Sequence, residues 1–168
     1  MYDSLKLLAE VAGFAAVGDM NNNKLFTQFW SATLNRGWGE EQENIYHALA
    51  HRYDLGELGF NAGVMAFPTS LITPKLREEL FRLCEQYLPI VITGEQPILN
   101  LLFYKNWQEL THHYNFFIPL PPPLLTPENV KAAIVHFAGK AVKPWNKESP
   151  FHADWLSNRN AAESIRLS

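Results

Sequence analysis

The part of the sequence that most constrains the fold is a strand followed closely by a strongly patterned helix. Residues 60–67 have the composition of a buried strand, and a proline ends it. Thr73 and Pro74 then predict a helix start, because threonine is a good N-cap and the fixed φ of proline suits the first turn. Apolar side chains recur at helical spacing over residues 76–88 and form one face. A strand that leads into an amphipathic helix is typical of α/β proteins.

The rest of the chain continues this alternation of strands and helices. We expect buried extended segments at residues 14–17, 90–92 and 132–137, and helices at residues 5–11, 42–50, 95–105 and in the tail from residue 149. The prolines between residues 119 and 123 should hold that segment extended. Because the 168 residues contain no linker and no repeat, the sequence predicts a single α/β domain over residues 1–168.

The composition of the chain excludes several classes of protein. Hydrophobic residues make up 47% of the chain and charged residues 18%, which excludes a disordered protein. The net charge of −3 argues against a nucleic-acid partner, which would need clustered Lys and Arg. Cys84 is the single cysteine, and the sequence has neither an apolar run long enough to span a membrane nor a signal peptide. We therefore expect a cytoplasmic protein with no membrane span.

Two polar features in the middle of the chain are candidates for a binding or catalytic site. Asn61, Ala62 and Gly63 interrupt a strand, where glycine often marks the close approach of a ligand and asparagine suits sugar hydroxyls. Glu95 and Gln96 open a predicted helix, where both would face a substrate. Each feature has a structural alternative, namely a hydrogen-bonded asparagine in a tightly packed strand and a carboxylate stabilised by a helix N-terminus.

Two further candidates follow toward the C-terminus. His136 ends a predicted strand, where ligands bind in α/β folds, and a neutral imidazole is a common metal ligand. Its structural alternative is a hydrogen-bonded core histidine. Gly139 and Lys143 lie in the next loop, where glycine allows close approach of the backbone and lysine offers positive charge to a phosphate. By itself, a surface loop with two lysines carries almost no information about function.

Taken in order, these features resemble glycosyltransferase family 8, which includes glycogenin, bacterial lipopolysaccharide galactosyltransferases and plant galactinol synthase. The matching blocks are F-N-A-G-V at residues 60–64, E-Q-P-I-L-N at 95–100, Y-N-F at 114–116 and H-F-A-G at 136–139, with K-P-W at 143–145. The resemblance implies a GT-A type mixed α/β sheet with flanking helices. It also implies a retaining transfer of a hexose from a nucleotide-sugar donor, commonly UDP-linked, to a carbohydrate or other hydroxyl acceptor, with Mn²⁺ as a helper.

Carried over position by position, the resemblance also assigns roles to the candidate residues. It implies Asn61, Ala62 and Gly63 in the donor-sugar pocket, Glu95 and Gln96 at the anomeric carbon and donor hydroxyls, Gly139 and Lys143 at the diphosphate, and His136 on the metal. These roles agree with the chemistry, because a departing diphosphate needs positive charge where negative charge develops.

The chain departs from the pattern of the family in three ways. It has no Asp-x-Asp, the motif that supplies the other metal ligands of the family, and one histidine alone holds Mn²⁺ weakly. Residues 14–19 match the strand that follows this motif, so we expect a fold that lacks the N-terminal nucleotide-binding strands. Glu95 stands where aspartate is commoner. His136 and Lys143 are seven positions apart, one more than in many members.

Two alternatives to an active transferase therefore stay open. The chain would be a truncated, non-catalytic remnant that serves as a sugar-binding or assembly module and needs a partner chain, or an unrelated protein whose motifs coincide. A sheet that lacks its first strands would also leave an unpaired edge, which is a template for pairing with another chain. We expect self-association or a partner along that edge.

Overall fold

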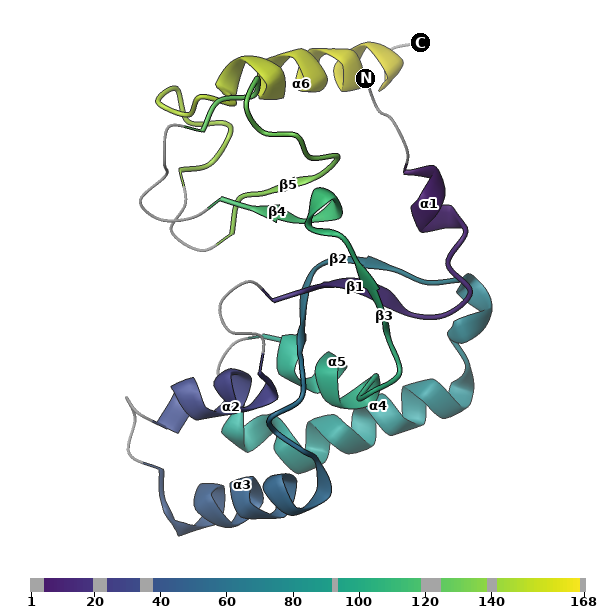
Figure 1. Cartoon of the computed structure of the whole chain (residues 1–168), viewed down its shortest axis with the longest axis vertical. Coiled ribbons are helices and arrows are strands. Elements are labelled where there is room, and N and C mark those ends of the chain that lie inside the picture. Colours follow the sequence, from purple (N-terminus) through teal and green to yellow (C-terminus); the bar gives the residue numbers. More distant parts are fainter. Residues whose placement is uncertain are drawn as a thin grey trace. The chain divides into compact units, whose positions relative to one another are not determined.

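The computed structural model describes residues 5–19, 24–33, 38–91, 94–118, 125–138 and 142–166. The chain divides into two compact units, Met1–His112 and His113–Ser168, and each is described by itself (Figure 1). This division does not test the expected single domain, which stays a prediction.

The first unit contains three strands and five α-helices among its described residues. They are α1 (Lys6–Ala9), β1 (Ala15–Gly18), α2 (Leu25–Thr33), α3 (Glu40–Arg52), β2 (Phe60–Ala66), α4 (Pro74–Tyr87), α5 (Gln96–Leu102) and β3 (Gln108–Leu110). Helices α2 to α5 gather on the same side of the sheet in Figure 1. The predicted strands at 14–17 and 60–67 and the predicted helices at 42–50, 73–88 and 95–105 are confirmed, with small differences in their ends.

The sheet of the first unit has the order β2-β1-β3. β1 is antiparallel to β2 and parallel to β3, so the sheet is mixed, as expected. The pairing of β1 with β2 changes register between Ala16 and Val17, which places Val17 opposite Asn61. The short strand β3 was not expected from the sequence, because three residues with two exposed side chains carry little periodicity.

Helix α4 begins as its sequence predicts. The hydroxyl of Thr73 accepts a hydrogen bond from the Leu76 N–H at 3.1 Å, and Pro74 occupies the first turn. Its inward face contributes Leu83 and Tyr87 to a core shared with α2, α3 and α5, in which Phe29 and Leu49 are also fully buried. A second cluster beside the sheet stacks Phe14 on Phe103, with ring centroids 3.8 Å apart.

One expected element of the first unit is only partly as predicted. The sequence predicted an extended segment at 90–92, and the backbone of Val91 is extended, but Ile90 belongs to the 3-10 turn Leu88–Ile90. The physical reason is Pro89, whose fixed φ suits the first turn of a helix and continues the chain from α4 into a tighter turn. Ile90 is buried, as expected, and residue 92 lies outside the described residues.

The second unit contains β4 (Phe116–Phe117), β5 (Val135–His136) and α6 (His152–Arg166). β4 and β5 pair in parallel, with Phe117 opposite His136. The predicted strand at 132–137 is thus confirmed but shorter, and the predicted helix in the tail is confirmed. Ile118 and Phe151 form the buried centre of a small apolar cluster. The segment 119–123, expected to be extended, lies outside the described residues, and so does Gly139.

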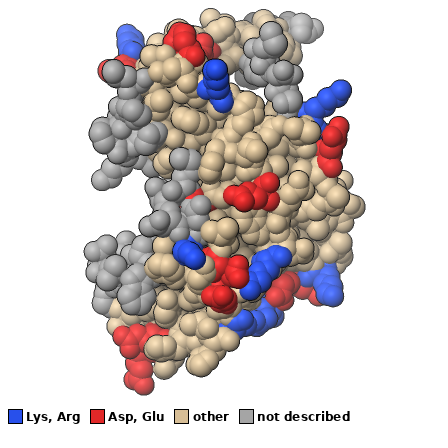
Figure 2. All heavy atoms as spheres, viewed as in Figure 1, with Lys and Arg blue, Asp and Glu red and all other residues tan. Residues whose placement is uncertain are grey.

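The described surface mixes charges of both signs. Figure 2 shows acidic and basic side chains next to one another on the face drawn. Three ion pairs are formed among the described residues, Arg82–Glu79, Lys105–Glu57 and Arg159–Glu163. In the part of the chain that the structure describes, no helix is long and apolar enough to cross a membrane.

Candidate functional site

Gln96 joins three elements of the first unit at one end of the sheet. Its side-chain oxygen accepts a hydrogen bond from the Ala62 N–H of β2 at 2.9 Å. Its side-chain nitrogen donates to Oδ2 of Asp19, the residue that follows β1, at 3.2 Å. Gln96 itself is the first residue of α5, with Pro97 beside it in the first turn. The candidate residues Gln96 and Ala62 are therefore in direct contact, although 34 positions separate them.

Asn100, one turn further along α5, makes a second link to the same strand. Its Oδ1 accepts from the Phe60 N–H at 2.7 Å, and its Nδ2 donates to the Phe60 carbonyl at 2.9 Å and to the Gln96 carbonyl at 3.0 Å. Its side chain is almost fully buried, with 2% of its surface exposed. Asn100 therefore completes the backbone hydrogen bonding of Phe60 and holds α5 in register with β2.

The other candidates of the first unit lie around this link. The side chain of Asn61 accepts from the Gly63 N–H at 2.9 Å, and Gly63 is exposed. Glu95 is the N-cap of α5, but its side chain makes no capping hydrogen bond and is exposed. Gly94 precedes it with φ of 57°, a conformation that favours glycine. This turn presents the Glu95 carboxylate to solvent at the end of the sheet where Asp19 and Gln96 meet.

The candidates of the second unit lie around the end of β5. Nδ1 of His136 is 2.9 Å from Oδ1 of Asn115. Asn115 directly precedes β4, and His136 is the last residue of β5, with which β4 pairs. The ammonium of Lys143 donates a hydrogen bond to the carbonyl of Phe137, the residue after His136. His136 and Lys143 are thus brought to the same short stretch of backbone. Gly139 cannot be placed with them, because it lies outside the described residues.

The environment of His136 favours its neutral form. Burial lowers the pKa of His136 below its ordinary value, and the positive charge of Lys143 lowers that pKa further. A neutral imidazole keeps one nitrogen lone pair, which is able to bind a metal ion or accept a hydrogen bond. His136 is therefore prepared to act as a ligand at neutral pH.

Acidification is expected to destabilise the folded protein through His136. Because the folded state lowers the pKa of His136, the unfolded chain binds more protons as the pH falls below about 6.5. The stability due to the neutral imidazole is thus present above about pH 6.5 and lost as the pH falls through the lower folded pKa. Urea unfolding measured between about pH 8 and pH 5 should show the free energy of unfolding falling by less than about 1 kcal/mol, because solvent partly screens the site. His136→Gln should remove this fall. An unchanged pH dependence in His136→Gln would contradict this.

The described residues do not by themselves make a complete metal site. Among them, no group of three or more His, Cys, Asp or Glu side chains is close enough together to hold a metal ion. His136 has the right chemistry for a single ligand, but an octahedral ion such as Mn²⁺ needs several more donors. Those donors would have to come from a bound ligand or from elsewhere.

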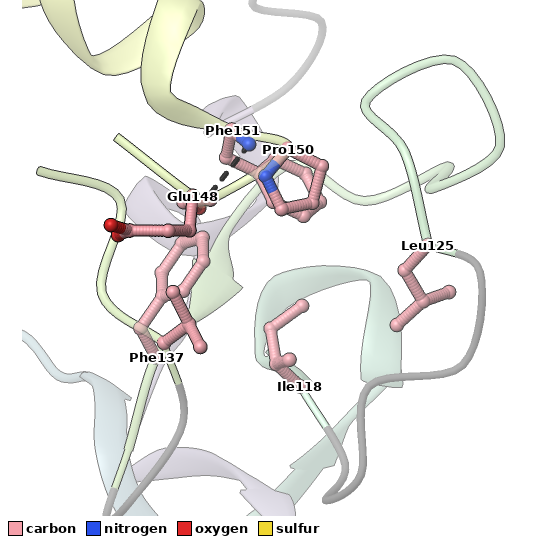
Figure 3. A pocket seen from close by; sticks show the side chains of 8 residues that line it. Ile118, Leu125, Phe137, Glu148, Pro150 and Phe151 are labelled. Carbon is pink, nitrogen blue, oxygen red and sulfur yellow. Dashed lines mark hydrogen bonds between the residues drawn. The ribbon is translucent and has the colours of Figure 1, made fainter. Parts of the chain in front are cut away.

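Each unit also has an apolar hollow apart from the polar candidates. The second unit has a cavity of about 70 Å³. Figure 3 shows the side chains of Ile118, Phe137 and Leu125 pointing into it. Beside it, the Phe151 N–H donates to the Ser149 hydroxyl at 3.3 Å. The first unit has a larger hollow of about 320 Å³ between the sheet and α4, lined by apolar side chains and by Arg77. No candidate site residue of the first unit lines the larger hollow.

Three residues of the site were given no role from the sequence. Asp19 appeared only in the segment 14–19 that matches the strand after the missing Asp-x-Asp motif, and Asn100 and Asn115 were quoted within the blocks of the family resemblance. For the two asparagines, their positions in those blocks were the available signal. The two groups of candidates, around Gln96 and around His136, belong to different units, so their convergence in one site stays a prediction.

Comparison with known proteins identifies the family of the chain. The family model described as Glycosyl transferase family 8 matches residues 14–149, a range that contains both groups of candidates. No curated protein and no solved structure matches the chain.

Proposed function

Because the chain belongs to glycosyl transferase family 8, we propose that it is a retaining hexosyltransferase, or part of one. It would transfer a hexose from a UDP-linked nucleotide sugar to a carbohydrate or other hydroxyl acceptor. The observation that carries this proposal is the family match over residues 14–149, which spans both groups of polar residues. A cytoplasmic location belongs to the same proposal.

The residues around Gln96 would bind the donor sugar. Asn61, Ala62 and Gly63 line the strand end with backbone and amide groups, which suit sugar hydroxyls. Gln96 and the exposed carboxylate of Glu95 would face the anomeric carbon. Support comes from the hydrogen bond between Gln96 and the Ala62 N–H, which holds the side chain at the strand end before any ligand binds.

The residues around His136 would bind the diphosphate. The Lys143 ammonium uses one hydrogen bond on the Phe137 carbonyl and has three donors in all, so further donors are available for phosphate oxygens. Its positive charge would stabilise the negative charge that develops on the leaving diphosphate. The backbone around Gly139 would also bind the diphosphate.

A divalent metal is typical of this family, and we propose that the metal here is Mn²⁺, which would neutralise the diphosphate when bound. His136 is our candidate for its one ligand from the described residues. Since those residues do not hold the ion alone, we derive no catalytic step through it.

The unpaired edges of the sheet favour pairing with another chain. β2 and β3 are the outer strands of the described sheet, so each has one side without a neighbouring strand among the described residues. We propose that a second copy or a partner chain pairs along such an edge, where it would add backbone hydrogen bonds.

Calorimetric titration of UDP, with and without Mn²⁺, tests the proposed function. We expect micromolar binding that depends on Mn²⁺ and that His136→Ala weakens at least tenfold, because the ion loses a protein ligand. The control is His113→Ala, a histidine of the same unit whose side chain is exposed. Release of UDP from several UDP-sugars then tests for transfer or hydrolysis. A chain that neither binds UDP nor releases it would be a non-catalytic remnant.

A further inference from the structure

Asn115 is a buried polar residue of the Y-N-F block, and it has no role in the proposed function. Only 2% of its surface is exposed, and its Oδ1 lies 2.9 Å from Nδ1 of His136. The two backbones around this contact are held together, since the Phe116 N–H donates to the Ile134 carbonyl at 2.9 Å and the Ile118 N–H donates to the His136 carbonyl at 3.2 Å. The relative position of the two side chains is therefore set by the parallel pairing of β4 with β5.

The chemistry of this contact decides where the imidazole carries its proton. An amide oxygen only accepts hydrogen bonds, so Nδ1 of His136 must be the protonated nitrogen. In the neutral ring, Nε2 then holds the lone pair. Histidines that bind metal ions are usually oriented in this way, by a partner on the other ring nitrogen.

We propose that Asn115 is a positioning residue that fixes His136 in the Nδ1–H tautomer and thereby presents the lone pair of Nε2 to a metal ion. The assignment of the tautomer follows from the contact alone. The use of the lone pair rests on the proposed function, in which His136 meets the metal–nucleotide complex.

NMR of the full chain with ¹⁵N-labelled histidine tests the tautomer directly. His136 should show a protonated Nδ1 and an unprotonated Nε2 at neutral pH, with His136→Gln used to assign its signals. His113 and His152 supply internal references, since their Nδ1 atoms each lie 3.1 Å from a backbone carbonyl, of Lys131 and Pro144 respectively. A protonated Nε2 on His136 in the unchanged protein would overturn the proposal, because the Asn115 amide would then be donating.

Two variants separate positioning from simple packing. Asn115→Leu removes the acceptor at similar size, and we expect His136 to lose its single tautomer while His113 and His152 keep theirs. Asn115→Asp keeps an oxygen acceptor and should keep the Nδ1–H tautomer. A single unchanged tautomer in Asn115→Leu would overturn the proposal. Unchanged signals of the two reference histidines establish that the unit is folded.

Binding of the metal gives the second readout. Mn²⁺ added with UDP should broaden the His136 signals, and Asn115→Leu should weaken that binding about tenfold, whereas Asn115→Asp should not. Equal affinity in the unchanged protein and in Asn115→Leu would overturn the role of Asn115 toward the metal. Absence of binding in the unchanged protein would instead contradict the proposed function, and the tautomer measurement would still decide the positioning role.

Discussion

Asn100→Ala is expected to lower the free energy of unfolding by about 3 kcal/mol. The substitution removes the partner of both the N–H and the carbonyl of Phe60, at 2.7 and 2.9 Å, in a site with 2% exposure. Each backbone group left unsatisfied in a buried site costs about 1–3 kcal/mol. The substitution would also remove the side-chain link between α5 and β2.

Chemical denaturation measures this effect. Trp107 packs against the Phe60 ring, with centroids 5.3 Å apart, so its fluorescence reports on the affected region. The matched control is Asn106→Ala, the same truncation at an exposed position that should change stability by no more than about 0.5 kcal/mol. Equal effects of the two substitutions would show that the Asn100 link contributes little.

Gln96→Leu is expected to reduce sugar transfer by about 100-fold or more. Leucine keeps the size of the side chain but removes the acceptor for the Ala62 N–H and the donor to Asp19. In the proposed function Gln96 faces the anomeric carbon, and a polar group aimed at a reacting centre typically contributes a factor of about 10²–10³ to the rate. Stability should fall by only about 1 kcal/mol, the net value of an ordinary hydrogen bond in a partly buried site.

Release of UDP from the donor sugar measures the effect of Gln96→Leu. Gln86→Leu on α4 is the matched control, because it removes an exposed glutamine that bonds to Arg82 on the same helix. That control should leave the rate unchanged. If Gln96→Leu keeps its rate and loses only stability, Gln96 links the elements of the first unit and has no part in the chemistry.

Local signals in the sequence accounted for most of the helices and strands. Thr73 and Pro74 determine the start of α4 because their effect depends only on the first turn. Pro97 near the start of α5 acts in the same way. The exception is Ile90, which was expected in an extended segment, because Pro89 suits the first turn of a new helix and draws Leu88–Ile90 into a 3-10 turn.

The candidate site was predicted as a set of residues but not as a set of contacts. Gln96 and Ala62 were named from the motif blocks, and the structure joins them by a hydrogen bond. The contact of Asp19 was missed because no local pattern distinguishes an aspartate that ends a strand from one that binds a glutamine 77 positions away. Asn115 was quoted in a motif block, but the block does not show that its side chain meets His136. Such a contact depends on which strand ends lie next to each other.

The sequence by itself determined the family, the mixed α/β class and the approximate positions of most helices and strands, because motifs, caps and periodicity act over a few neighbouring residues. Only the tertiary structure decided that β1 lies between β2 and β3 and that Gln96 reaches Asp19. It also decided that His136 meets Asn115, 21 positions earlier in the chain. These contacts follow from the pairing of strands and the packing of α5 against β2, and such pairing is selected by the burial of the whole unit rather than by any one segment.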